Sequence, residues 1–329
     1  MKSRQRAFAA TATVLAMAGL AACGSGGAAD AGAQNTKTLT VGTIPIGPQV
    51  PLLIAEKHGF FKEQGLTVKP QTSTAFDATL AGVLNGQYDI GFGAAPPLLS
   101  ALSKAAPVKV VAQTASIETP QGPGKSGADV DVIDPSIKRP RDLEGKTLAV
   151  TSLNDLGAVG LRAAVMKDGG DPKSLKLVEM PGAQQLGALL SGRVASANFN
   201  EPNAAVARAN PKVRVLFGYT DYLPQGAPLD VYFAKNDFIR KNPATLEKFR
   251  AALARAVAYA NEHPDEVRAI TQKLWENVSE QIAAKTVMQR YSTDVDKKAL
   301  DSLQDVLTRY AGLEKRTSPN DFYSYTPGS

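Results

Sequence analysis

The chain has 329 residues, of which 43% are hydrophobic and 21% charged, so it is long enough for one large or two medium folding units. Its 37 Lys and Arg against 31 Asp and Glu give a formal net charge of +6. Three of the basic residues lie at the amino terminus, and the later ones are mixed with acidic residues. Because no basic stripe remains, the sequence argues against nucleic-acid binding.

The amino terminus has the parts of a secretory signal: basic residues 1–6, an apolar stretch at 7–20, and small residues after it. The apolar stretch is too short for a comfortable membrane span. It ends in Leu20-Ala21-Ala22-Cys23, which resembles the lipobox of bacterial lipoprotein precursors. The resemblance implies cleavage before Cys23 and a lipid such as palmitate on its sulfur.

A plain signal peptide with an incidental cysteine is the alternative. Cys23 is the one cysteine of the sequence, so an intramolecular disulfide does not explain it. Residues 24–37 are rich in Gly and Ala and predict a flexible tether. We therefore expect a protein held to the cell membrane by its lipid and facing the extracytoplasmic side.

Strands and helices alternate at the start of the folded part. Residues 38–44 alternate in polarity and are rich in β-branched side chains, which favours a strand. A helix is predicted over 51–65, a short strand over 66–70, a helix with its apolar stripe at 80–86, and a strand over 88–92. Since no Asn-Gly hairpin turn separates these elements, we expect parallel β-α-β units.

The same order of elements reappears later in the chain. Leu39 and Val41 have counterparts in Leu148 and Val150. The helical stripe that ends at Gly86 likewise has a counterpart at 186–192. Two similarly wired lobes are predicted, unless the likeness reflects only the regularity of any two β-α-β units.

Beyond Asp230 the apolar residues fall at helical spacing. Asn242-Pro243 offers a cap and a first-turn residue for a helix that ends before Pro264. Two further stripes follow at 267–274 and 300–310. We expect these helices to pack on the first lobe, which would then be discontinuous in sequence.

Four segments in this order resemble the sulfonate/nitrate/taurine and thiamine-precursor group of periplasmic-type binding proteins. They are 51–62 with its Gly-Phe-Phe, 85–93, 142–150 with its Asp-Leu-x-Gly-Lys, and Asn200-Glu201-Pro202. The resemblance implies an α/β type II periplasmic-binding-protein fold, with two Rossmann-like lobes, a ligand cleft and two hinge crossings. One departure is that Asn200 precedes the Glu-Pro step, where the group often has an aromatic residue.

The resemblance also implies a domain plan. Its parts are a signal peptide at 1–22, the lipidated cysteine and tether at 23–37, a first lobe at 38–118 plus 229–329, and a second lobe at 119–228. The hinges would lie near 114–124 and 219–229.

The function that the resemblance implies is that of a monomeric solute-binding component of an ABC importer. It would pass a small sulfonate-, nitrate- or taurine-like solute to the membrane permease. A thiamine-precursor pyrimidine or an aromatic acid is the alternative solute. An exported enzyme on the same fold and an interaction module without a ligand are the alternative functions.

Ligands of open α/β lobes bind outside the carboxyl ends of the strands, so the loops after predicted strands supply the candidates. The candidate ligand-binding residues are Gln49, Ser73, Thr74, Phe76, Gly93 and Ala94 in the first lobe, and Ser152, Asn154, Gly157, Asn200, Glu201 and Tyr219 in the second. Helix capping is the alternative role for Ser73, Asp77, Ser152 and Asn154. These loops contain acidic residues but no Lys or Arg, which favours a neutral, zwitterionic or aromatic solute.

Catalytic chemistry has little support in the sequence. His58 and His263 are the two histidines, and neither lies near a nucleophile or a set of metal ligands in the sequence. Residues 122–126 end in Gly-Lys-Ser but lack the leading glycine of a phosphate-binding loop. The sequence therefore predicts no catalytic residue, no metal site and no cofactor.

Overall fold

The structure is a computed structural model that describes residues 37–73, 75–118, 122–275 and 278–325. All of these belong to one compact unit, residues 35–329. The predicted signal peptide, Cys23, nearly all of the predicted tether and Thr74 lie outside the described residues.

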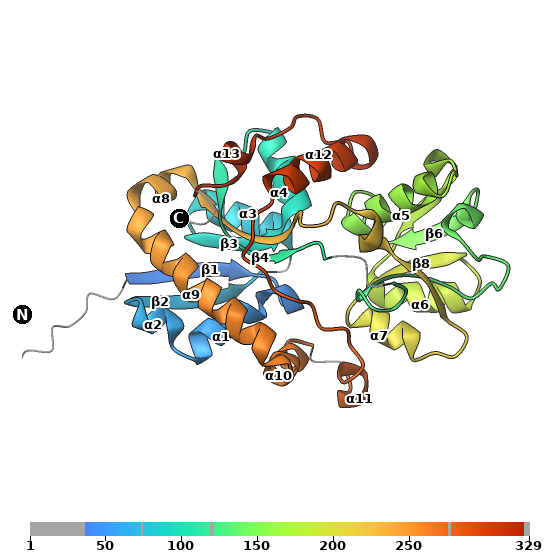
Figure 1. The fold of residues 1–329 in the computed structure, drawn as a ribbon, viewed down its shortest axis with the longest axis horizontal. Coiled ribbons are helices and arrows are strands. Elements are labelled where there is room, and N and C mark those ends of the chain that lie inside the picture. Colours follow the sequence, from blue (N-terminus) through green and yellow to red (C-terminus); the bar gives the residue numbers. More distant parts are fainter. Residues whose placement is uncertain (1–36, 74, 119–121, 276–277, 326–329) are drawn as a thin grey trace, which may run out of the picture. The chain divides into compact units, whose positions relative to one another are not determined.

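The first sheet has five strands in the order β2-β1-β3-β10-β4 (Figure 1). Its strands are β1 (Lys37–Thr43), β2 (Leu66–Thr72), β3 (Ile90–Ala94), β4 (Val108–Ser116) and β10 (Pro228–Lys235). β1 runs parallel to β2 and β3, as the sequence predicts. β10 runs antiparallel to both β3 and β4, and this strand was not predicted from the sequence.

The second sheet repeats this plan with the order β7-β6-β8-β5-β9. Its strands are β5 (Ala128–Val132), β6 (Thr147–Val150), β7 (Lys176–Glu179), β8 (Ser196–Asn200) and β9 (Arg214–Gly218). β6 is parallel to β7 and β8, and β5 is antiparallel to β8 and β9. Since β5 holds the place that β10 holds in the first sheet, the internal likeness of the sequence reflects a shared topology. The lobe limits at 118/119 and 228/229 stay a proposal.

Helices flank both sheets. The α-helices are α1 (Val50–Lys57), α2 (Phe60–Glu63), α3 (Phe76–Asn85), α4 (Ala95–Ser103), α5 (Leu156–Lys167), α6 (Gly182–Leu190), α7 (Asn203–Arg208), α8 (Asn236–Lys241), α9 (Pro243–Glu262), α10 (Pro264–Leu274), α11 (Glu280–Ala283), α12 (Lys297–Ala311) and α13 (Pro319–Phe322). Short 3₁₀ helices are η1 (Gly47–Gln49), η2 (Pro140–Leu143), η3 (Pro172–Ser174) and η4 (Tyr219–Tyr222). The single helix predicted over 51–65 is divided, because Gly59 adopts a φ of 75° between α1 and α2.

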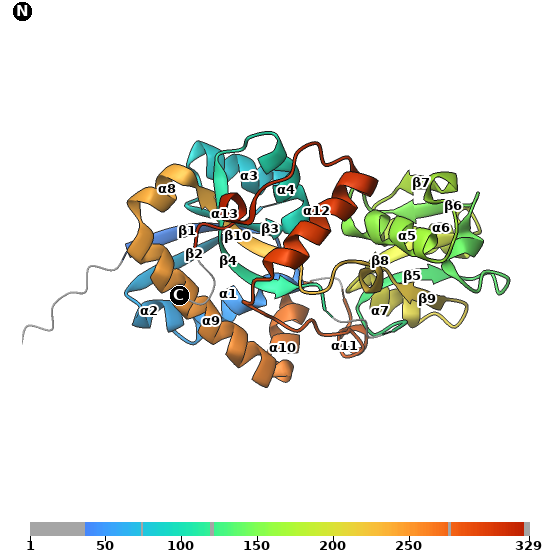
Figure 2. The same cartoon turned by 45° about the horizontal axis from the view of Figure 1, so that its top comes forward.

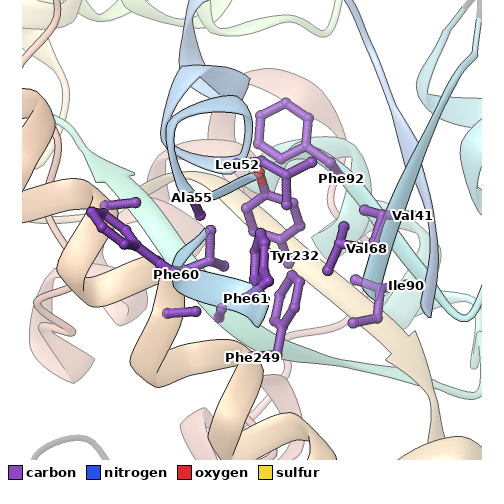
Figure 3. Close-up of a cluster of buried hydrophobic side chains, with 14 of the residues drawn as sticks. Val41, Leu52, Ala55, Phe60, Phe61, Val68, Ile90, Phe92, Tyr232 and Phe249 are labelled. Atoms are coloured by element: carbon purple, nitrogen blue, oxygen red, sulfur yellow. The ribbon is translucent and has the colours of Figure 1, made fainter. Parts of the chain in front are cut away.

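Two hydrophobic clusters bury the faces of the first sheet. On one face Phe92 and Tyr232 pack with α1, α2 and Phe249 of α9 (Figure 3). On the other face Phe233 packs with α3, α4 and Leu303 of α12, and the positions of α9 and α12 can be followed in Figure 2. The predicted return of the carboxy-terminal helices to the first sheet is therefore confirmed.

The ring of Tyr88 occupies space that glycines leave beside the first sheet. A Cβ atom on Gly82 of α3 would lie 2.4 Å from Cδ2 of Tyr88, and a Cβ atom on Gly42 of β1 would also lie 2.4 Å from it. Tyr88 itself is 7% exposed. The close approach of α3 to β1 therefore depends on residues without a side chain.

The variant Gly82→Ala should destabilise the protein. Overpacking of a filled core costs about 1–3 kcal/mol, so we expect that loss in the free energy of unfolding, measured by urea denaturation. Gly187→Ala is the matched control, because Gly187 lies in the equivalent helix α6 with no atom within 4 Å of its added Cβ. The control should be neutral or gain up to about 1 kcal/mol. Equal effects of the two variants would contradict this packing.

Candidate functional site

Both sheets have an edge at which their parallel strands end, and we call each of these the strand-end edge. At the first one, Asp230 of β10 pairs with Ala94 of β3 and with Ala115 of β4. At the second one, Ala128 of β5 pairs with Asn200 of β8. Because the two sheets share one strand order, Asp230 and Ala128 occupy equivalent positions, as do Ala94 and Asn200. At this pair of equivalent positions each edge therefore carries one polar side chain, which is Asp230 in the first sheet and Asn200 in the second.

Asp230 is a buried acid at the first strand-end edge, with 4% of its surface exposed. Burial raises the pKa of its carboxyl to about 7, and the nearby Gln289 amide offsets part of this effect, although Nε2 of Gln289 makes no hydrogen bond of ordinary geometry. Burial also raises the pKa of Tyr232 and Tyr291, and the Asp230 carboxylate raises both further. The acid and the two phenols therefore lie close together.

Several buried polar atoms in this region have no hydrogen-bond partner in the described part of the chain. They include Oε1 of Gln49, Oγ1 of Thr114 and Oη of Tyr232. Figure 3 shows the Tyr232 hydroxyl at the end of the ring that faces Leu52 and Phe92. The Tyr291 hydroxyl, in contrast, donates to the carbonyl oxygen of Gly47 over 3.0 Å. Each buried polar group without a partner costs about 1–3 kcal/mol, and a bound molecule with matching groups would remove that cost.

Tyr219 lies between acidic groups of the two sheets. Its hydroxyl donates to Oδ1 of Asn200, and the residue is 4% exposed. Burial raises the pKa of Tyr219, and the carboxylates of Asp155, Asp129 and Asp230 raise it further. Since Asp155 and Asp129 belong to the second sheet and its connections, and Asp230 to the first sheet, Tyr219 is near enough to charged groups of both sheets for each to act on its pKa.

Helix α5 begins at the second strand-end edge with Asp155 as its cap. The Asp155 carboxylate accepts hydrogen bonds from the backbone N–H of Ala158 at 2.7 Å and of Ser152 at 3.0 Å. Burial raises the pKa of this carboxyl, and the backbone hydrogen bonds act in the opposite direction. The cap is therefore Asp155, and the alternative role of Ser152 and Asn154 as caps does not hold.

Gly157 and Asn198 meet just below that cap. A Cβ atom on Gly157 would lie 3.0 Å from Nδ2 of Asn198. Asn198 is 4% exposed, and neither Nδ2 nor Oδ1 of its side chain has a hydrogen-bond partner. Asn198 is not among the residues predicted from the sequence, since an Asn inside a short strand gives no local sign of burial.

The candidates that follow β2 lie partly outside the described residues. Ser73 is 5% exposed, and its hydroxyl contacts the carbonyl oxygen of Ala75 at 3.3 Å. Thr74 is not among the described residues. Ala75 is the residue that precedes α3, and no side-chain hydrogen bond caps this helix. Helix capping therefore does not explain Ser73 or Asp77.

Phe76 and Gly93 form a packing contact at the first strand-end edge. A Cβ atom on Gly93 would lie 2.6 Å from Cδ2 of Phe76, and the Phe76 ring lies 5.7 Å from that of Phe233. Phe76 thus belongs in part to the core beneath the edge, while Ala94 ends β3 beside Asp230. Roles for these residues in ligand binding stay predictions.

The Glu201 carboxylate is occupied by other groups of the protein. It pairs with Arg208 and accepts hydrogen bonds from the backbone N–H of Ala205 at 3.1 Å and of Val287 at 3.0 Å. Arg208 also pairs with Asp129. Because Val287 lies between α11 and α12, Glu201 fastens this later segment to the second sheet. Its predicted role as a ligand contact remains untested.

Asp131 is a second buried acid on β5. It is fully buried, and neither carboxylate oxygen has a hydrogen-bond partner. Burial, and after it the Asp129 carboxylate, raise its pKa to about 8, while Arg208 acts in the opposite direction. Asp131 is therefore mostly protonated at neutral pH.

The variant Asp131→Asn should flatten the pH dependence of stability. The unfolded chain loses this proton near pH 3.8, whereas the folded chain keeps it to about pH 8. The wild type therefore loses stability from this group as pH rises between those values, by up to about 1.4 kcal/mol per pH unit. Urea denaturation across that range should give a shallower decline for the variant. The exposed Asp265→Asn serves as control, and equal slopes for wild type and Asp131→Asn would contradict the burial argument.

Two pockets open on the helices that cover the first sheet. One has a volume of about 430 Å³ and is lined by His58, Phe60, Arg255, Ala258, Tyr259 and Glu262. The other has a volume of about 390 Å³ and is lined by Ala260, Asn261, Pro264, Val267, Met288, Gln289 and Arg290. Neither includes a predicted ligand-binding residue, although Gln289 also lies beside Asp230.

Among the described residues, no group of three or more His, Cys, Asp or Glu side chains is placed to hold a metal ion. Within the same part of the chain, no helix is long and apolar enough to cross a membrane.

The profile of the NMT1/THI5-like family matches residues 48–267, more than half of the chain. The chain belongs to this family. It also shares 24% identity over 262 residues with a Bacillus subtilis (strain 168) protein named "Putative binding protein YtlA", which covers 78% of this chain and 74% of that one. The family match thus includes α1, the second sheet and α9.

Solved structures share the fold. The periplasmic aliphatic sulphonate binding protein SsuA of Escherichia coli matches with a TM-score of 0.74 and 18% identity, covering 89% of this chain and 93% of that chain. A ligand-binding component of an ABC-type import system from Staphylococcus aureus matches with a TM-score of 0.70 and 12% identity, covering 87% and 96%. The predicted α/β type II periplasmic-binding-protein fold is confirmed.

Proposed function

We propose that this protein is the extracytoplasmic solute-binding component of an ABC importer. It captures a small organic solute between its two strand-end edges and delivers it to a membrane permease. The observation that carries this proposal is the convergence of Asp230, Tyr219 and Asn200 from two sheets of the same topology. The likeness to a component of an ABC-type import system supports it.

Binding would stabilise a closed arrangement because the solute contacts both edges only when they face each other across it. A ligand shifts such an equilibrium by its difference in affinity for the two arrangements. The chain leaves the first sheet where β4 ends at Ser116, enters the second sheet where β5 begins at Ala128, and returns through 219–227, between β9 and β10. Thr114 itself lies inside β4, so we place the first hinge after Ser116.

The sulphonate-binding protein of similar fold supports a sulfonate-, nitrate- or taurine-like solute. A thiamine-precursor pyrimidine or an aromatic acid is the alternative. The buried phenol rings of Tyr219 and Tyr291 favour it, because aromatic faces stack on planar rings.

The positions of both histidines support binding rather than catalysis. Nε2 of His58 lies 2.9 Å from the Glu266 carboxylate. The ring of His263 stacks on Tyr259 at 3.8 Å. Both histidines therefore take part in packing among α1, α9 and α10. Neither is placed with a nucleophile near Asp230 or Asn200.

Calorimetry against sulfonates, nitrate, pyrimidines and aromatic acids tests the proposed function. We expect one class to bind and to be recovered unchanged. Tyr219→Phe should weaken binding by about 2- to 10-fold, because it removes the hydroxyl that positions Asn200. Tyr310→Phe on α12 is the control and should bind as the wild type does. Chemical conversion of a bound compound would argue for the enzyme instead.

Lipid anchoring through Cys23 needs its own test. In cells that produce the full-length chain, radiolabelled palmitate should enter the wild-type protein and not Cys23→Ser. The wild type should sediment with membranes, and the variant should be released or accumulate as an unprocessed precursor. Labelling of the variant at the wild-type level would rule out Cys23 as the lipid site.

A further inference from the structure

We propose that the solute carries a positively charged nitrogen, held at the first strand-end edge by Asp230 together with the hydroxyl of Tyr232. This inference rests on the proposed function and names the chemical class of its solute. The nitrogen is that of a primary, secondary or quaternary ammonium group, or of an amidine.

The charges around Asp230 motivate the proposal. No Lys, Arg or His side chain of the described residues is among the groups that shift the pKa of Asp230. Two arginines of the helices that flank the second sheet are engaged with other groups: Arg208 pairs with Asp129 and Glu201, and Arg162 donates to the carbonyl oxygens of Leu153 and Tyr310. A buried carboxylate without a cation is costly, and a bound cation offsets that cost.

The groups beside Asp230 also suit a cation. Tyr232 is fully buried, and its hydroxyl has no hydrogen-bond partner. This oxygen can accept a hydrogen bond from an ammonium or amidine N–H. The phenol ring of Tyr291 provides a face that attracts a quaternary nitrogen, which has no N–H to donate.

The position of Asp230 brings the second sheet into the same site. The Asp230 carboxylate raises the pKa of Tyr219, whose hydroxyl is bonded to Asn200. The rest of the solute would therefore extend toward the neutral side chains of Tyr219 and Asn200, and the carboxylates of Asp155 and Asp129 also act on Tyr219. A solute with its positive nitrogen at Asp230 fits this arrangement, whereas a simple anion does not.

Matched pairs of compounds separate the charged nitrogen from the rest of the solute. Taurine is compared with isethionate, which replaces the ammonium by a hydroxyl. Choline is compared with 3,3-dimethylbutan-1-ol, which replaces the quaternary nitrogen by carbon. Putrescine and ethanesulfonate complete the panel. Binding is measured by calorimetry and by the shift in melting temperature.

We expect at least one nitrogen-bearing compound to bind, and its neutral or anionic partner to bind at least about tenfold more weakly. Asp230→Asn should weaken the nitrogen-bearing compound by about 10- to 100-fold, while Asp265→Asn should not change it. Tyr232→Phe should weaken it by a smaller factor.

The pH dependence of wild-type binding gives a readout that does not depend on a folded variant. The groups that face Asp230 are Tyr232 on its own strand, Tyr219 of η4, and Gln289 and Tyr291 from the segment between α11 and α12. Of these, only the Asp230 carboxyl titrates near pH 7. Affinity for the cation should therefore fall as pH decreases below about 7, approaching tenfold per pH unit.

Two results would overturn the inference. One is that isethionate, ethanesulfonate or another compound without a cationic nitrogen binds while the nitrogen-bearing compounds do not, which would leave the proposed function standing. The other is an affinity that rises at low pH, which would mean that a protonated Asp230 donates to an anion. If no compound of any class binds, the proposed function fails and the inference fails with it.

Discussion

The strand order of the two sheets is the constraint on which the site depends. Parallel strands joined by helices have both faces covered, so polar groups that meet a ligand collect where the strands end. In each sheet an antiparallel strand, β10 or β5, arrives from the other half of the chain and begins at that edge. This strand order places Asp230 beside Ala94 and Ala128 beside Asn200. In each sheet it thereby brings together two stretches that are distant in the sequence.

Burial of polar groups without partners then gives the edge its chemistry. The side chains of Tyr232 and Asn198 are almost completely removed from solvent and carry polar atoms without a hydrogen-bond partner, which would destabilise the protein if nothing compensated it. Glu201 shows the contrast, since Arg208 and two backbone N–H groups satisfy its carboxylate. We interpret the satisfied groups as the frame that joins the segments, and the unsatisfied ones as the groups that a solute completes. The buried Asp230 carboxyl on the same strand as Tyr232 is what favours a cationic solute.

Residue patterns in the sequence predicted those elements of the fold that neighbouring residues in the chain determine. The strand near residues 38–44 and the helix that ends at Gly86 follow from alternation and helical spacing, and Gly86 adopts a φ of 84° at the helix end. β10 was missed because its residues are buried on both faces and its place between β3 and β4 depends on pairing with distant strands. For the same reason, the sequence around Asp230 did not indicate that its side chain is buried. Gln49, Gly157, Asn200 and Tyr219 do lie near the strand ends, since position along a strand can be read from sequence.

A crystal structure of the protein with its bound solute tests the central claim most directly. The account predicts that the solute contacts side chains from both strand-end edges, with Asp230 on one side and Asn200 or Tyr219 on the other. A solute that lies in the pocket lined by His58 and Tyr259, or that touches one sheet alone, would contradict it.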